Sequence, residues 1–145
     1  MDTVRRGRRP DPGKRAAIVD AACGLFAQQG YGVPMEAIAA SAGVSKQTIY
    51  NLFSTKEQLF GAVVASRSQV IVEAIPAPAE ALPAAEGLAR IAREYLRFMT
   101  GGQVPLVYRL MLTAPPDADI TRTFYDNGPR RALGQLSAWL AARDA

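Results

Sequence analysis

Apolar residues recur three and four positions apart along most of this 145-residue chain. The first such stripe runs from Ile18 through Ala22 to Phe26. It predicts a helix over residues 13–29, which Gly30 can end by adopting a positive φ. The chain has no segment with the alternation of apolar and polar residues that is typical of a half-buried β-strand. The sequence therefore predicts an all-α fold.

The segment after Gly43 has the most informative sequence pattern in the chain. A short helix is expected to end there, and the hydroxyl of Ser45 is placed to cap the next one. At about 100° per residue, Ile49 and Phe53 fall on one side of that next helix, where they can pack. The residues on its other side are polar: Lys46, Gln47, Tyr50 and Asn51. Two short helices joined by a glycine-containing turn, the second with one free polar side, form the helix–turn–helix arrangement.

The polar residues of this helix have the chemistry of DNA contacts. Gln47 and Asn51 can both donate to and accept from adenine, and Lys46 can bind guanine or a phosphate. Thr48 and Tyr50 can donate hydrogen bonds to phosphates. Polar arcs are also common on helices that only face water, so these residues alone leave both interpretations open.

Basic charge is concentrated at the start of the chain. Residues 1–15 contain six basic and two acidic side chains, and their net charge of +4 equals that of the whole chain. The basic ones are Arg5, Arg6, Arg8, Arg9, Lys14 and Arg15. We expect residues 1–12 to form a flexible basic arm that binds a polyanion, with a solvated tail as the alternative.

Composition excludes several kinds of chemistry. Histidine is absent and Cys23 is the only cysteine, so no Cys/His zinc site, histidine-dependent nucleophile or intramolecular disulfide can form within the chain. The acidic residues of the second half show no paired spacing on an apolar face, which disfavours an enzyme. We therefore expect no catalytic residues, no cofactor and no metal site. No apolar run is long enough for a membrane span, which favours a cytoplasmic protein without membrane contact.

A long fourth helix is expected from Thr55 to about Ile75, with Ser54 and Glu57 as its capping box. Residues 73–83 then comprise the end of this helix and a proline-rich linker. The helical pattern returns beyond the linker and continues to the last residues of the chain.

The string from Ala42 to Phe60, together with Ala37-Ile38-Ala39 before it, closely resembles the DNA-binding domain of the tetracycline-repressor (TetR) family. Ile18–Phe26 and the following Gly30-Tyr31 are similar to that family's first helix and its turn. The resemblance covers residues 13–72.

The resemblance implies an architecture. The helix–turn–helix lies at about 35–54, within a three-helix DNA-binding unit. The fourth helix joins this unit to a helical ligand-binding and dimerisation domain at residues 84–145. Family members usually continue into two further helices that form most of the dimer interface, so we expect residues 84–145 to be an incomplete domain.

The resemblance also assigns roles to individual residues. Lys56, at the start of the fourth helix, would bind a phosphate, and the arm arginines would reach the DNA backbone or an adjoining minor groove. The residues that would face DNA are Ser45, Lys46, Gln47, Thr48, Tyr50 and Asn51. The family commonly has Thr or Ser to cap the second helix, where this chain has Val33 and Pro34. This departure removes a cap worth about 1 kcal/mol.

Candidate ligand-binding residues lie in the second half. They are Tyr95, Phe98, Met99, Tyr108, Arg109, Met111 and Phe124. Arg109 could pair with an anion, whereas ordinary core packing is the alternative for the apolar and aromatic members. Trp139 is expected to pack, or to lie on an apolar surface left uncovered.

The sequence therefore predicts a sequence-specific DNA-binding transcriptional regulator. We expect a homodimeric repressor with two partners, double-stranded operator DNA and a small-molecule inducer that relieves repression. The alternative is a helical adaptor or ligand-binding protein whose DNA binding is impaired because the dimerisation helices are missing.

Overall fold

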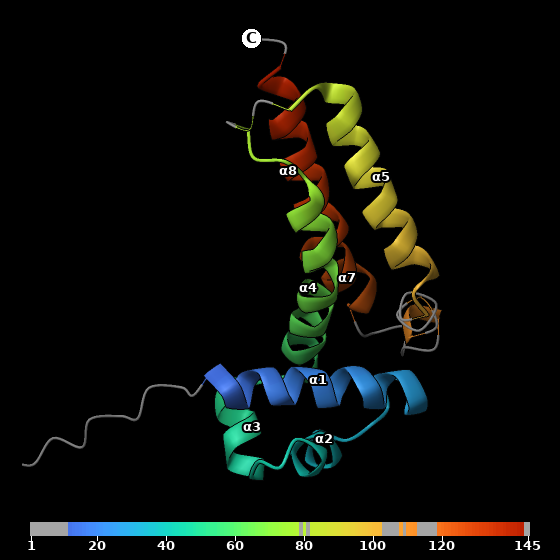
Figure 1. Ribbon diagram of the computed structural model, residues 1–145. Helices are drawn as coiled ribbons and strands as arrows, with labels where there is room; N and C mark the ends of the chain where they lie inside the picture. Colours follow the sequence, from blue (N-terminus) through green and yellow to red (C-terminus); the bar gives the residue numbers. More distant parts are fainter. Residues whose placement is uncertain are drawn as a thin grey trace, which may run out of the picture.

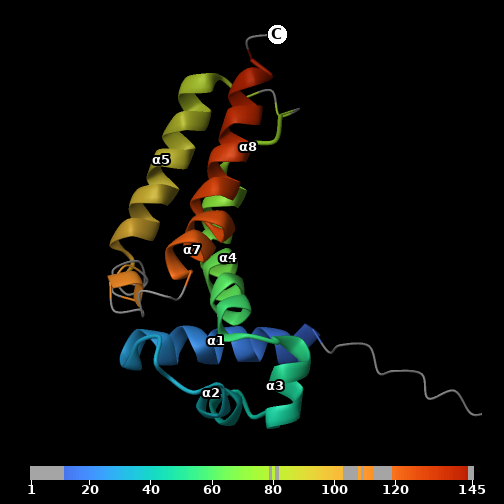
Figure 2. The same ribbon diagram turned by 180° about the vertical axis from the view of Figure 1, so that it is seen from behind.

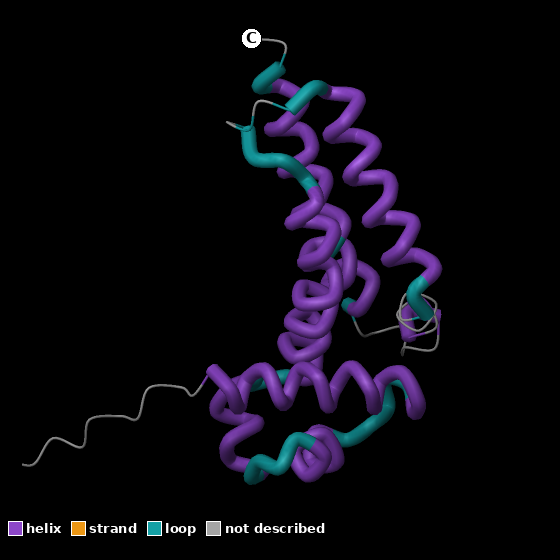
Figure 3. The backbone as a smooth tube through the Cα atoms, in the orientation of Figure 1, coloured by secondary structure: helices purple, strands orange, loops and turns teal. Residues whose placement is uncertain are grey.

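The computed structural model describes residues 12–78, 80, 82–102, 108, 110–112 and 119–143. Every regular element in these ranges is a helix, which confirms the all-α prediction. The helices are α1 (Pro12–Gln29), α2 (Met35–Ser41), α3 (Lys46–Leu52), α4 (Lys56–Ala74), α5 (Ala84–Thr100), α7 (Ile120–Asn127) and α8 (Pro129–Ala141). Figure 3 shows how short the connections are between the helices of the N-terminal part.

The helices form two parts that share α4. In Figure 1, α1 lies across the base with α2 and α3 beneath it, and α4 rises from this base. We call residues 12–64, from α1 to the first half of α4, the head. The described residues from 65 onward, with α5, α7 and α8, are the body. The view from behind shows α7 and α8 alongside α4, in agreement with the contacts that α4 makes with both helices (Figure 2).

The core of the head is aromatic and well covered. Phe26, Phe60 and Ile49 are each at most 1% exposed. The Phe26 ring stacks on Tyr31 with centroids 5.8 Å apart, and Phe60 meets both rings edge-on at about 6 Å. Such aromatic pairs add to the free energy gained by burying apolar area. This core holds α1, α3 and α4 together and so determines where the exposed side of α3 lies.

Most helix ends agree with those predicted from the sequence. Gly30 and Gly43 adopt φ of 81° and 67°, in the left-handed region that glycine favours. Pro34 is the N-cap of α2 and provides no side-chain cap, as expected from the missing Thr or Ser.

The capping box expected at Ser54 and Glu57 is wrong by one residue. Thr55 is the N-cap of α4, and its hydroxyl accepts a hydrogen bond from the Gln58 backbone N–H at 3.2 Å. The Gln58 side chain in turn accepts one from the Ser54 backbone N–H at 3.1 Å. Ser54 and Thr55 have interchangeable capping chemistry, so spacing alone could not choose between them.

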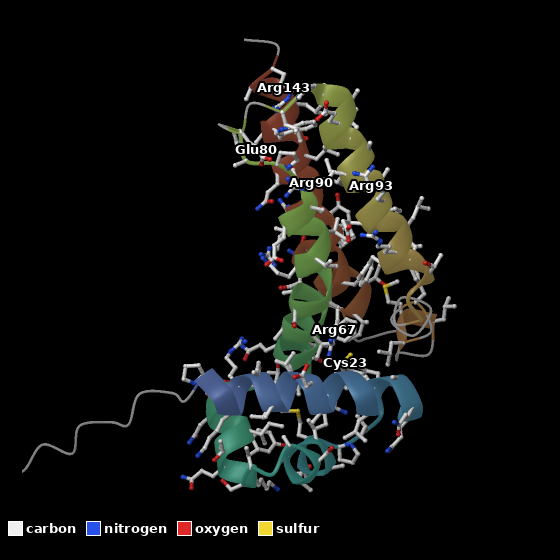
Figure 4. The ribbon with its side chains drawn as sticks, viewed as in Figure 1. Cys23, Arg67, Glu80, Arg90, Arg93 and Arg143 are labelled. Carbon is white, nitrogen blue, oxygen red and sulfur yellow. The ribbon has the colours of Figure 1, made fainter. Side chains whose placement is uncertain are left out.

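At the end of the body farthest from α1, side chains pack and form hydrogen bonds around Trp139. Its side chain is fully buried, which confirms that it packs. The Arg143 guanidinium lies 3.9 Å from the centre of the Trp139 ring and donates hydrogen bonds to the carbonyls of Glu80 and Leu82. Arg90 donates to the Glu80 carboxylate at 3.2 Å. Figure 4 shows these arginines and Glu80 together at the end of the body farthest from α1.

Candidate nucleic-acid interface and ligand cavity

One side of α3 is buried and the other is free. Ile49 and Phe53 are at most 1% exposed and insert into the core of the head. Five residues on or next to α3 are exposed: Ser45, Lys46, Gln47, Tyr50 and Asn51. Thr48 is half-buried. The structure therefore brings all six residues expected to face DNA onto a helix that the core holds in place.

The turn between α2 and α3 is defined by backbone contacts. The Val44 N–H donates to the Ala39 carbonyl at 3.0 Å, across the left-handed Gly43. Ser45 then caps α3, because its hydroxyl accepts a hydrogen bond from the Thr48 N–H at 3.1 Å. The Ser45 and Thr48 hydroxyls are also 2.8 Å apart. These contacts orient the first turn of α3 without using Gln47 or Asn51.

Gln47 and Asn51 keep their side-chain amides available. Within the described residues, neither amide has a hydrogen-bond partner. Each amide carries two N–H donors and a carbonyl acceptor, the set needed to pair with the edge of adenine.

Glu36 on α2 is a residue of this surface that the sequence analysis missed. Its carboxylate lies 2.8 Å from the Lys46 ammonium and accepts a hydrogen bond from the Tyr50 hydroxyl at 3.4 Å. The hydrogen bond with Lys46 lowers the pKa of Glu36 and raises the pKa of Lys46, so both groups stay charged at neutral pH. A negative charge thus lies within the polar surface formed around α3.

Lys56 at the start of α4 is half-buried beside Tyr31. Its ammonium donates to the Tyr31 carbonyl at 3.1 Å and lies 5.2 Å from the centre of the Tyr31 ring. Burial, with a smaller contribution from the nearby Glu57, raises the pKa of the Tyr31 hydroxyl. A phosphate contact by Lys56 would have to use the N–H donors that Tyr31 leaves free.

Residues 1–11 of the expected arm lie outside the described residues, and with them Arg5, Arg6, Arg8 and Arg9. Pro12, expected to be the last residue of the arm, instead begins α1. Arg15, inside α1, lies 4.8 Å above the Phe53 ring and so covers the end of α3.

A cavity of about 370 Å³ opens between α4, α5, α7 and α8. Five of the candidate ligand-binding residues line it, namely Tyr95, Phe98, Met99, Tyr108 and Phe124. Met111 packs against the core instead of lining the cavity, and Arg109 lies outside the described residues. The sequence analysis missed the contribution of α4, whose Val64, Arg67 and Ser68 form part of the wall.

Comparisons with known proteins match both halves of the chain. Residues 18–63 match the family of bacterial regulatory proteins called the tetR family, and residues 86–145 match the C-terminal domain of AefR-like transcriptional repressors. No curated protein matches the sequence.

Several solved structures are similar over most of the chain. The flavonoid-responsive regulator FrrA is 30% identical, with a TM-score of 0.70 over 90% of this chain and 68% of its own. A TetR-family transcriptional regulator from Mesorhizobium loti MAFF303099 is 33% identical, with a TM-score of 0.71 over 94% and 70%. The multidrug binding protein EbrR, solved with imidazole, is 30% identical, with a TM-score of 0.63 over 97% and 76%.

Proposed function

The chain belongs to the TetR family and is a DNA-binding transcriptional regulator, and we propose that it is a repressor that a small molecule releases from its operator. The family consists of regulators and not of enzymes. These matches favour a regulator over a helical adaptor with impaired DNA binding. In the described part of the chain, no helix has the length and apolar character needed to cross a bilayer.

The observation that carries the DNA-binding role is the two-sided character of α3. Ile49 and Phe53 hold the helix in the core, while Gln47 and Asn51 present unpaired amides to the outside. A major groove about 12 Å wide admits one helix. We assign base contacts to these two amides.

The residues around them receive backbone roles in this proposal. The phosphates are bound by the hydroxyl groups of Ser45, Thr48 and Tyr50 and by the ammonium groups of Lys46 and Lys56. Arg5, Arg6, Arg8 and Arg9 of the arm bind the DNA backbone or the minor groove beside it. Phosphate contacts fix the register of a protein on DNA, whereas base contacts read the sequence.

The effector binds in the cavity of the body in this proposal. The relatives support a small molecule, since FrrA is flavonoid-responsive and EbrR binds multiple drugs. The helix α4 joins the two sites, because Leu59 and Phe60 belong to the core of the head while Ser68 and Ile71 line the cavity. A ligand that changes the position of α4 therefore changes the position of α3. Tyr95, Phe98, Met99, Tyr108 and Phe124 form the ligand contacts, and Arg109 and Met111 remain further candidates.

TetR-family regulators act as dimers, and we assign the same assembly to this protein. Leu133 and Leu140 on α8 are exposed apolar side chains that a second copy could cover. A dimer would hold two heads over half-sites roughly one helical turn of DNA apart, or a multiple of it.

Selection from a pool of random duplexes tests the proposal without knowledge of the operator. The full chain should enrich a palindromic sequence, and its affinity should fall with salt by about 0.9 log units per log unit for each phosphate contact. Lys46→Ala should lower the magnitude of this slope by about 0.9, the amount expected for loss of one phosphate contact. Failure to enrich any sequence, together with binding that does not respond to salt, would contradict the proposal.

A further inference from the structure

Arg67 belongs both to the cavity wall and to the junction with the head. It lies on α4, next to Ser68, and both residues line the cavity. Its guanidinium reaches α1, where Nη2 donates to the Asp20 carboxylate at 2.9 Å and Nε donates to the Cys23 sulfur at 3.2 Å. Figure 4 shows Arg67 at the foot of the body with Cys23 directly beneath it on α1.

The composition of the cavity limits what can bind there. Its wall is made mainly of aliphatic and aromatic side chains, among them Tyr95, Phe98 and Phe124. A volume of about 370 Å³ lies in the range of small-molecule sites. Of the described residues that line it, Arg67 alone carries a charge, and none is a carboxylate. A cationic ligand would therefore lack an opposite charge in this part of the wall, whereas an anionic one would find Arg67.

The ion pair of Arg67 with Asp20 is open to exchange. The Asp20 side chain is 70% exposed, and the Arg67 side chain is 30% exposed. Pairs that reach solvent contribute little stability, because water competes for both charges. Among the described residues, Nη1 of Arg67 has no hydrogen-bond partner, so the guanidinium also has donors to spare.

We propose that the effector is an aromatic molecule with one anionic oxygen group, and that Arg67 binds this group in exchange for Asp20. The inference rests on the proposed function, because it names the ligand class of the same cavity. The aromatic part of the ligand packs against Tyr95, Phe98 and Phe124. The exchange removes an ion pair between α4 and α1, which links filling of the cavity to the head.

Two fluorescent probes isolate the role of the charge. Anilinonaphthalene sulfonate is an aromatic anion, and phenylnaphthylamine has the same ring frame without the sulfonate. Both probes become bright in apolar surroundings. Ala132→Phe, which places a large side chain at the cavity wall, defines the fraction of each signal that comes from the cavity.

Arg67→Gln should weaken cavity binding of the sulfonate by about tenfold and leave phenylnaphthylamine within about twofold, as expected for loss of one charge-assisted hydrogen bond. Arg67→Lys keeps the charge but loses the planar fork, so it should weaken the sulfonate less than Arg67→Gln does. Thermal melts followed by circular dichroism check that each variant folds.

Asp20→Asn tests the exchange itself. With its competitor removed, Arg67 should bind the sulfonate about twofold to fivefold more tightly, while phenylnaphthylamine is unaffected. An unchanged sulfonate affinity in Asp20→Asn overturns the exchange.

The remaining outcomes separate this inference from the proposed function. Equal loss of both probes in Arg67→Gln assigns Arg67 a structural role and overturns the inference, while ligand binding in the cavity stands. Binding of phenylnaphthylamine without the sulfonate also overturns it. If neither probe gives a signal that Ala132→Phe removes, the cavity does not bind such molecules and the effector role of the proposed function fails with it.

Discussion

The head and the body pack their helices differently. Each of the four helices of the head contributes residues to one buried core, and Ile18, Ile38, Ile49 and Leu59 are all fully buried in it. In the body, α5 has 17 residues and only Gly87 among them is buried. Leu96 on this helix is 62% exposed. Other residues of α5, among them Tyr95 and Phe98, line the cavity.

The difference corresponds to the two roles. A helix that reads base edges must be held in one orientation, and a close-packed core provides this because it has few alternative arrangements. A ligand site needs space and helices that can adjust around different contents. The helix α4 takes part in both, so a change in the body has a direct structural path to the head.

Truncation of a core side chain should produce the largest contrast between the two parts. Phe60→Ala removes a fully buried ring that contacts Phe26 and Tyr31, and it should lower the free energy of unfolding by about 3–5 kcal/mol. Truncation of an exposed apolar side chain of the body, Leu96→Ala, should cost less than about 0.5 kcal/mol. Urea denaturation measures both values. Similar losses for the two variants would show that the body is as tightly packed as the head.

The tight contact at the top of the body gives the next largest effect. A Cβ at Gly87 would lie 2.3 Å from the Trp139 ring, so Gly87→Ala forces the indole or α5 to move and should cost about 1–3 kcal/mol. Trp139 is the only tryptophan of the chain, and its emission should shift to the red as the ring gains exposure. Gly134→Ala is the control, because a Cβ there meets nothing within 4 Å. A Gly87→Ala protein with wild-type emission and stability would refute the close packing of Trp139.

Loss of the cap of α3 should have a smaller effect. Ser45→Ala removes the acceptor for the Thr48 N–H and should lower the free energy of unfolding by about 1 kcal/mol. Ser41→Ala, at the exposed end of α2, makes the same chemical change without removing an N-cap. Equal stability of these two variants in thermal melts would show that the cap does not hold α3.

Removing the negative charge next to α3 should produce the smallest change. Glu36→Gln leaves Lys46 and Tyr50 without their carboxylate partner, so we expect a few-fold gain in affinity for every duplex, selected or random. The reason is that Glu36 repels phosphates and competes with them for Lys46. Gel shifts at a fixed salt concentration measure the gain. Weaker binding would indicate that Glu36 instead orients Lys46 toward DNA.

Local patterns predicted the head better than the body. The 100° spacing placed Ile49 inside and Asn51 outside, because a helix of known phase needs no tertiary information to sort its faces. Ser45 was identified as a cap for the same reason, since its partner lies three residues away. The predicted cap of α4 was wrong by one residue because Ser54 and Thr55 are adjacent and both carry a hydroxyl that can cap a helix.

Contacts between helices could not be obtained in this way. The pair of Glu36 with Lys46 depends on the angle at which α2 crosses α3, and periodicity does not specify that angle. The same limit applies to Arg67, because the pattern of α4 shows which residues share a face but not what lies opposite. The burial of Trp139 likewise depends on Gly87, which is far from it in sequence.

The variant Asn51→Ala shows whether the free side of α3 reads DNA sequence. On the selected duplex, fluorescence anisotropy should show a loss of about 1–3 kcal/mol in binding free energy, with little change on random DNA. Gln135→Ala, which removes an exposed side-chain amide on α8, should leave both affinities unchanged. Equal affinity of Asn51→Ala and the wild type for the selected duplex would contradict the claim.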